Sequence, residues 1–158
     1  MADTGNEIVT SRKMESTTED STVRRTETVK RHLRFGWWSL FVFILLGTVL
    51  EGLIGFKWTP YITDDIRQTL WRLAHAHGTL LGLVHIAFAL TVHSDVGATP
   101  HHWISPSLIT ASLLLPGGFF AGGMFTFNGD PGVGVLVVPL GASFMIAAVL
   151  LIARSFKS

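Results

Sequence analysis

Three histidines, His75, His77 and His85, lie in the strongly apolar stretch 71–92, WRLAHAHGTLLGLVHIAFALTV. Ionisable side chains are rare at membrane depth, and those that occur there face a bundle interior, an ion pathway or a partner charge. Imidazole nitrogens bind zinc, copper and iron, and they exchange protons near neutral pH. The stretch therefore indicates a site of metal, haem or proton chemistry.

Two charged residues are expected close to these histidines. Glu51 lies near the end of an earlier apolar segment, 36–56, and Arg72 stands one turn before His75. If the two segments are antiparallel neighbours, the ~1.5 Å rise of each helical residue places Glu51 at the depth of Arg72 and His75. A cluster of carboxylate, guanidinium and imidazole groups is therefore predicted between the first two helices.

Two interpretations of this cluster remain open. In the structural one, Glu51 and Arg72 form a buried ion pair that fixes the register of the two helices. In the functional one, Glu51, His75 and His77 ligate a transition metal or carry protons. His75 and His77 point about 200° apart on a regular helix, so a single metal binds both only if the helix is distorted.

Haem is a further candidate cofactor, with His75 and His85 as its binding residues, because they share one stripe of the helix. A haem with two imidazole ligands needs histidines from two facing helices. The other three apolar segments contain none. A haem would then need a methionine ligand, Met124 or Met145, or a homodimer that pairs the two histidine-bearing helices.

Four apolar segments are each long enough for the ~20 residues that a membrane-spanning helix needs. Short connections make sequential helices antiparallel neighbours, so the sequence predicts an all-α integral membrane four-helix bundle over 31–158. Pro116-Gly117-Gly118 is expected to break or kink the third segment, and 128–131, NGDP, predicts a turn after it. The four segments are 36–56, 66–92, 104–127 and 132–152.

The first thirty residues differ in composition from the rest of the 158-residue chain. They are rich in Thr, Ser, Glu and Arg and nearly free of bulky apolar residues, so we expect a disordered polar tail over 1–30. Seven of the twelve basic residues lie before residue 35, and the positive-inside rule then places both termini in the cytoplasm of a bacterial inner-membrane protein. Acids are interleaved with these cations, which excludes a nucleic-acid-binding face.

The run LAHAHGTLLGL, residues 73–83, with Arg72 before it and Glu51 in LEGLIGFK, resembles a group of small, uncharacterised four-helix bacterial membrane proteins. More distantly, a His-x-His with a glycine nearby at the start of a helix is similar to the haem- and copper-binding helices of haem–copper oxidase subunit I and NnrS-type proteins. The resemblance implies His75 and His77 as metal or haem ligands, with His85 as a third candidate. Those proteins carry further histidines on other helices, which is where this sequence departs from them.

Two functions are therefore expected. One is a small membrane module whose Glu51/Arg72/His75/His77 cluster binds a metal or haem in a redox or metal-handling role. The other is a non-catalytic accessory or assembly subunit of a larger membrane complex, or a homo-oligomer, in which the cluster is structural. The chain has no nucleophile–base pair, phosphate-binding loop or zincin spacing, so no catalytic residue is predicted.

Overall fold

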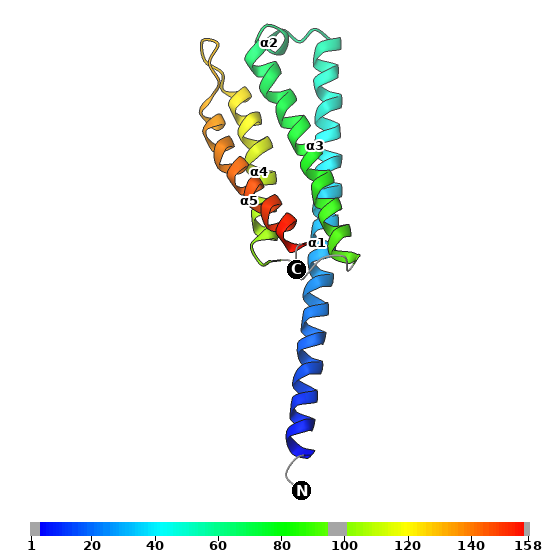
Figure 1. Ribbon diagram of the computed structural model, residues 1–158. Coiled ribbons are helices and arrows are strands. Elements are labelled where there is room, and N and C mark those ends of the chain that lie inside the picture. Colours follow the sequence, from blue (N-terminus) through cyan, green and yellow to red (C-terminus); the bar gives the residue numbers. More distant parts are fainter. Residues whose placement is uncertain (1–3, 95–100, 157–158) are drawn as a thin grey trace.

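The computed structural model describes residues 4–94 and 101–156, and within them the chain is helical with no β-strand (Figure 1). The all-α prediction is confirmed. The elements, in chain order, are α1 (Thr4–Gly55), the short α2 (Thr59–Ile62), α3 (Asp65–His93), α4 (Ile104–Met124), the 3-10 helix η1 (Val133–Val137) and α5 (Val138–Ser155).

Four helical stretches are long and apolar enough to cross a membrane. They are α1, α3, α4 and the continuous stretch formed by η1 and α5, and they coincide with the four apolar segments of the sequence. The fourth segment is divided into η1 and α5. The division falls at Pro139, which lies in the first turn of α5, where a proline that lacks an N–H is tolerated.

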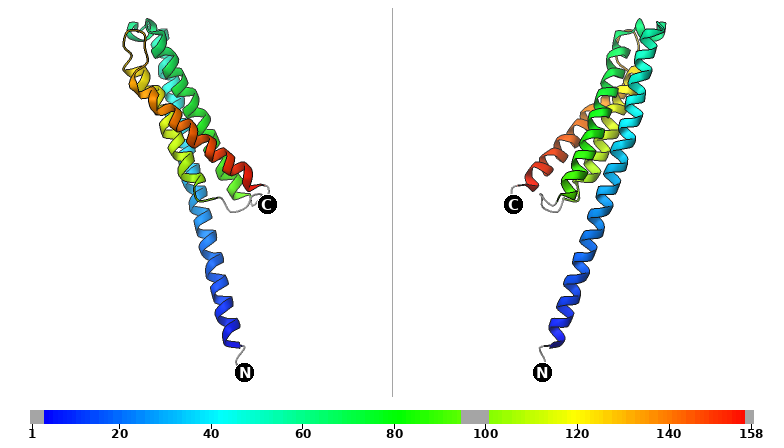
Figure 2. Two further views of the ribbon diagram at one scale, coloured as in Figure 1. Left: turned by 60° about the vertical axis from the view of Figure 1, so that its left-hand side comes forward. Right: turned by 90° about the vertical axis from the view of Figure 1, so that its right-hand side faces the viewer.

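The long helices pack in chain order, α1 on α3, α3 on α4 and α4 on α5 (Figures 1 and 2). The inner pair α3 and α4 bury more of their apolar residues than α1 and α5, which leave large side chains such as Trp38 and Ile146 outside. The most enclosed apolar contacts join Phe88 of α3, Leu108 of α4 and Ala148 of α5. The four helices therefore form a bundle with two inner and two outer members.

Glycines allow α1 and α3 to approach closely. A Cβ atom on Gly36 would lie 2.8 Å from the Gly82 carbonyl oxygen, and one on Gly78 would lie 2.2 Å from the Phe43 ring. Small residues at such crossings replace side-chain bulk by direct backbone contact, which is a common way for membrane helices to associate. The buried hydroxyl of Ser39 adds a hydrogen bond to the Gly78 carbonyl at 3.0 Å.

The expected break at Pro116 is absent, because α4 continues from Ile104 to Met124 with the proline inside it. Its ring is fully buried in the bundle. Gly118 and Gly122 next to it lie against η1 and the start of α5, so that a Cβ atom on either would approach a valine methyl group within 2.8 Å. The Pro-Gly sequence thus permits close packing of the fourth segment against α4.

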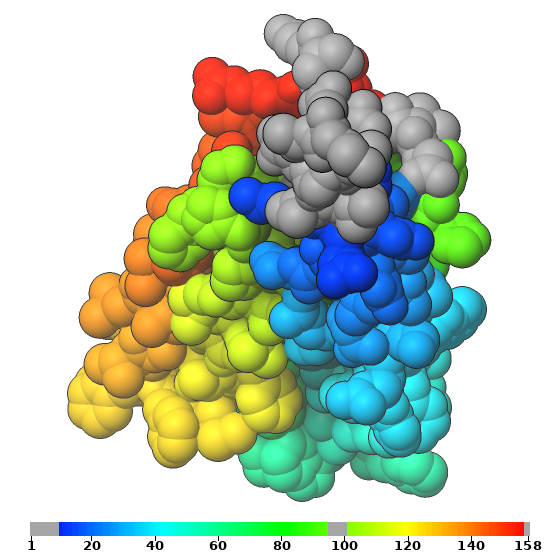
Figure 3. Space-filling view, turned by 90° about the horizontal axis from the view of Figure 1, so that it is seen from below, coloured from blue at the N-terminus to red at the C-terminus, as the bar shows by residue number. Residues whose placement is uncertain are grey.

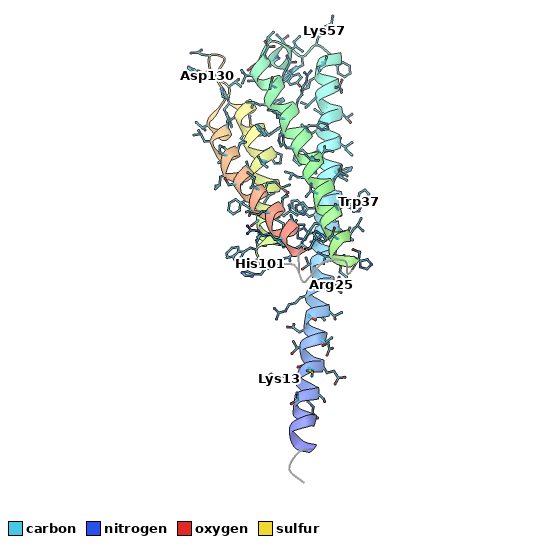
Figure 4. All side chains as sticks on the ribbon, in the orientation of Figure 1. Lys13, Arg25, Trp37, Lys57, His101 and Asp130 are labelled. Carbon is cyan, nitrogen blue, oxygen red and sulfur yellow. The ribbon has the colours of Figure 1, made fainter. Side chains whose placement is uncertain are left out.

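The polar N-terminal segment is helical in the structure, in contrast to the disorder expected for 1–30. It extends α1 and projects well beyond the other helices, with Lys13 on the projecting part (Figure 4). Its hydroxyls bond to carbonyls one turn earlier, as Thr17 does to Lys13, and Arg24 pairs with Asp20 at 2.6 Å. A helix that is already formed at residue 36 needs no new nucleus to grow backwards, which composition alone does not reveal.

One end of the bundle is closed by a turn and by the side chain of Arg67. At the end marked by Lys57 and Asp130 in Figure 4, residues 127–130 form the predicted turn, with Asn128 and Gly129 at positive φ. At the same end, Arg67 donates to the Gly123 carbonyl and to Thr126 Oγ1, both at 3.0 Å. These bonds fix the start of α3 against the end of α4.

Candidate functional site

The His75 side chain points from α3 into α1. Its Nδ1–H donates to the Phe43 carbonyl oxygen at 2.6 Å. The ring occupies the space above Gly47, where an added Cβ atom would lie 2.5 Å from a ring carbon. His75 therefore holds α1 and α3 together through a backbone hydrogen bond, and one of its two nitrogens is already engaged.

His77 faces the other side of α3, as its two-residue offset from His75 predicted. Its Nδ1 bonds to the Leu73 carbonyl oxygen of its own helix at 2.8 Å, and its ring lies 4.9 Å from that of Phe119 on α4. The two imidazoles are therefore separated by the body of the helix. The His-x-His spacing does not form a chelate here.

The expected ion pair between Glu51 and Arg72 is not formed. Both side chains are exposed, and neither makes a hydrogen bond or ion pair with any residue in 10–94 or 101–156 whose side chain is described. They line an open groove of about 290 Å³ on the outside of α1 and α3, which we call the Glu51 groove. Its lining residues are Ile44, Gly47, Thr48, Leu50, Glu51, Arg72 and His75.

The described residues contain no group of three or more His, Cys, Asp or Glu side chains placed to hold a metal ion. Glu51 and His75 share the groove, but His77 is on the opposite side of α3. The proposed ligand set Glu51, His75 and His77 is therefore not assembled. The physical reason is that a helix presents residues two apart to different neighbours.

The polar group that the fold does assemble lies towards the other end of the bundle, around His85. His85 and His32 are both fully buried, and their Nδ1 atoms are 2.6 Å apart. The far nitrogen of each ring bonds to a serine of α4, His32 Nε2 to Ser105 Oγ at 2.8 Å and His85 Nε2 to Ser112 Oγ at 2.9 Å. We call these four residues, contributed by α1, α3 and α4, the histidine chain.

The hydrogen bonds of the histidine chain fix its direction. Ser112 Oγ donates its single proton to the Leu108 carbonyl at 2.8 Å, so it accepts from His85 Nε2–H. A neutral His85 then has a bare Nδ1, which accepts from His32 Nδ1–H. The second ring nitrogen of His32, Nε2, is then unprotonated and accepts from the Ser105 hydroxyl. All imidazole nitrogens are satisfied, which removes the cost of burying them.

Aromatic rings enclose the two imidazoles. The rings of His32 and His85 stack at 4.8 Å between centroids, with Phe88 edge-on to His32 at 4.8 Å and Phe35 4.4 Å from His85. Among the described residues, no carboxylate forms a hydrogen bond with either imidazole. Such surroundings favour uncharged imidazoles.

His32 was missed because the sequence places it before the first apolar segment. The structure shows that the buried stripe of α1 continues through Gly36 to His32, one helical turn further. His32 lies four residues before Gly36, on the same stripe of the helix, and this spacing was present in the sequence. The expectation that no helix facing α3 carries a histidine is therefore wrong, because α1 carries the buried His32.

This arrangement changes the assessment of haem. A facing histidine, His32, exists within one chain, so neither a homodimer nor a methionine is needed to supply a second ligand. However, the two imidazoles are in direct hydrogen-bond contact, whereas an iron ligated by two histidines lies between them. Met124 lies exposed at the end of α4 and Met145 packs against the apolar core, so neither faces His75 or His85 as a ligand. The described geometry does not fit a haem.

Comparisons with protein-family models, with curated proteins and with solved structures find no match to this chain.

Proposed function

We propose that the chain is an integral membrane protein that crosses the bilayer four times, as a multi-pass protein of a bacterial inner membrane with both termini in the cytoplasm. The support is the four long apolar helices and the large apolar side chains that cover the outside of α1 and α5. An apolar surface of this extent is unstable in water and is covered by lipid or by another protein. Reporter fusions to each terminus test the orientation.

We further propose that the protein is a non-catalytic accessory module that docks a partner's transmembrane helix in the Glu51 groove. The observation that carries this proposal is the pair of unpaired charges, Glu51 and Arg72, on the outside of apolar helices. Acyl chains offer no hydrogen bonds to such groups. A helix with polar side chains at the same depth, from a second copy or a different subunit, would satisfy both.

The shape of the groove also supports a helix as its occupant. Added Cβ atoms on Gly52 and Gly55 would meet nothing within 4 Å, so the outer side of α1 is open beside Glu51. Small residues on an open face let a second helix approach until backbone atoms touch. The imidazole of His75 also lines the groove, and its position is fixed by the bond to Phe43.

The test is site-specific photo-crosslinking in native membranes. A photoreactive amino acid replaces Thr48 in the groove or, as the control, Val42, which is exposed elsewhere on α1. We expect a discrete protein adduct from position 48 only, and its loss when Glu51→Gln and Arg72→Gln are added. An adduct of twice the chain mass identifies a second copy. Equal adducts from both positions, or lipid adducts alone, would refute the proposal.

A second candidate function, metal handling, rests on the two facing Nδ1 atoms of His32 and His85, which would have to part from their direct hydrogen bond to admit an ion between them. Imidazole suits copper, zinc and iron, and the bond from His85 Nε2–H to Ser112 resembles the outer-shell bonds that orient metal-binding histidines. The test compares the metal content of purified wild-type protein with that of His85→Gln, using His77→Gln as the control. Metal that is lost only in His85→Gln supports this function, and equal metal content in all three proteins refutes it.

A further inference from the structure

The basic residues of α1 just before Trp37 are divided into engaged and free groups. Arg24 pairs with Asp20, and Arg25 donates to the Val92 carbonyl oxygen near the end of α3, which holds α1 to the bundle. By contrast, Lys30, Arg31 and Arg34 are exposed and make no hydrogen bond or ion pair with the residues whose side chains the structure describes. Three cations are therefore available for an external anion.

These free cations share one face of α1 with two aromatic residues. Together they line an open groove of about 690 Å³, the basic groove, formed by Glu27, Lys30, Arg31, Arg34, Phe35 and Trp38. The residues recur every three or four positions, so they form a continuous stripe along the helix. The groove is lined by three cations and one carboxylate, so its net charge is positive.

The order of groups along the stripe is the second observation. Lys30 and Arg31 come first, Trp38 lies about 10 Å further along the axis at ~1.5 Å per residue, and the apolar part of α1 follows. In Figure 4, Arg25 lies at the level where α1 leaves the bundle. Trp37 lies further along α1, inside the length of the bundle, and points away from the other helices. Exposed apolar residues continue beyond, with Phe41 59% and Val42 51% exposed.

Seen from this end, the projecting part of α1 stands in front of the bundle, next to the end of α3, the start of α4 and the end of α5 (Figure 3). The basic groove therefore lies at the boundary between the projecting helix and the apolar bundle. A cation, then an indole, then an aliphatic surface is also the order in which a bilayer presents phosphate, interfacial carbonyls and acyl chains.

We propose that the basic groove binds the phosphate of an anionic glycerophospholipid, with one acyl chain lying along Trp38, Phe41 and Val42. Arginine forms paired hydrogen bonds to two oxygens of a phosphate, and lysine adds a point charge. The Glu27 carboxylate at the edge of the groove accepts from headgroup hydroxyls. This site rests on the proposed membrane insertion and is separate from the Glu51 groove at the opposite end of α1.

The test measures lipid retention by native mass spectrometry of the detergent-purified full chain. The protein is incubated with equal amounts of phosphatidylglycerol and phosphatidylcholine that carry the same acyl chains. Each juxtamembrane cation contributes about 1 kcal/mol to anionic-lipid binding, so Lys30→Gln with Arg34→Gln should lower phosphatidylglycerol binding about 30-fold. The matched control, Arg12→Gln with Lys13→Gln, removes the same charge from the projecting part and should leave binding unchanged.

Three results separate the possibilities. Equal retention of the two lipids by the wild-type chain, or equal losses in the groove and control variants, would overturn the site. Complete displacement of phosphatidylglycerol by millimolar inorganic phosphate would show a phosphate site that does not use the acyl chain, which also contradicts the proposal. Failure of the wild-type chain to float with vesicles would instead reject membrane insertion, and hence the proposed function as a whole.

Discussion

The histidine chain makes a quantitative prediction about coupling between two buried side chains. Replacing His85 by leucine leaves His32 Nδ1–H buried without its acceptor, and replacing His32 leaves His85 Nδ1 without its donor. Each orphaned group costs about 1–3 kcal/mol. The double variant removes both groups and leaves Ser112 bonded to Leu108.

The double variant should therefore be less destabilised than the sum of the two single variants. Hydrogen bonds between membrane helices contribute about 0.6 kcal/mol on average and about 1.7 at most, which is at the low end of the orphaning cost. We expect a coupling free energy of about 1–2 kcal/mol between His32→Leu and His85→Leu. This is the size of interaction energy that double-mutant cycles find for residues in contact.

The assay is reversible unfolding of the detergent-solubilised protein by a denaturing surfactant, followed by circular dichroism. The control pairs His85→Leu with His77→Gln, because His77 bonds to its own helix and faces Phe119. These two changes should add within about 0.5 kcal/mol. Equal additivity for His32 and His85 would refute the inferred hydrogen-bonded chain.

Three further predictions concern packing, charge and a buried hydroxyl. Gly78→Ala should destabilise the fold by about 1–3 kcal/mol, since its Cβ atom would meet the Phe43 ring at 2.2 Å, whereas Gly117→Ala, with nothing within 4 Å, should be neutral or stabilising in thermal melts. Hydrogen bonds from Thr126 and from the Arg67 backbone hold the pKa of the Asp64 carboxyl below its usual value of 3.8, so its contribution to stability is complete above that value and is lost as the pH falls through the lower folded pKa. Melts at decreasing pH should show a steeper acid loss for wild type than for Asp64→Asn, and identical profiles would contradict the assignment. The fully buried Tyr61 hydroxyl has no hydrogen-bond partner among the described residues, so Tyr61→Phe should leave the unfolding midpoint unchanged or raise it, and a clear drop would reveal a partner.

The helices and their order were predictable because they follow from local apolar runs and turn sequences. The four apolar segments, the NGDP turn and the opposite facing of His75 and His77 all depend on periodicities of a few residues. The continuity of α4 through Pro116 was not predictable, because it depends on whether neighbouring helices enclose the proline. The prediction of disorder from composition was also wrong for residues 4–30. There the helix extends from the part of α1 that is already formed, although the segment has few apolar residues.

The polar sites were predicted only in part, for a reason that His32 and Glu51 illustrate. Depth can be calculated from the rise per residue, so Glu51, Arg72 and His75 were correctly placed in one region. Whether two side chains at one depth touch depends on helix rotation and separation, which the sequence does not give. Glu51 and Arg72 remain unpaired for this reason, while His32 meets His85 across a crossing set by Gly36 and Gly82.

The absence of any break in α1 between Thr4 and Gly55 has a mechanical consequence. Residues 4–30 add about 40 Å of helix at ~1.5 Å per residue, and no loop joins them to the apolar part. A continuous helix of this length rotates and tilts as one rigid body. A force applied near Lys13 would therefore act as a torque on the Gly36–Gly82 crossing, at which backbones touch without intervening side chains that could absorb the rotation.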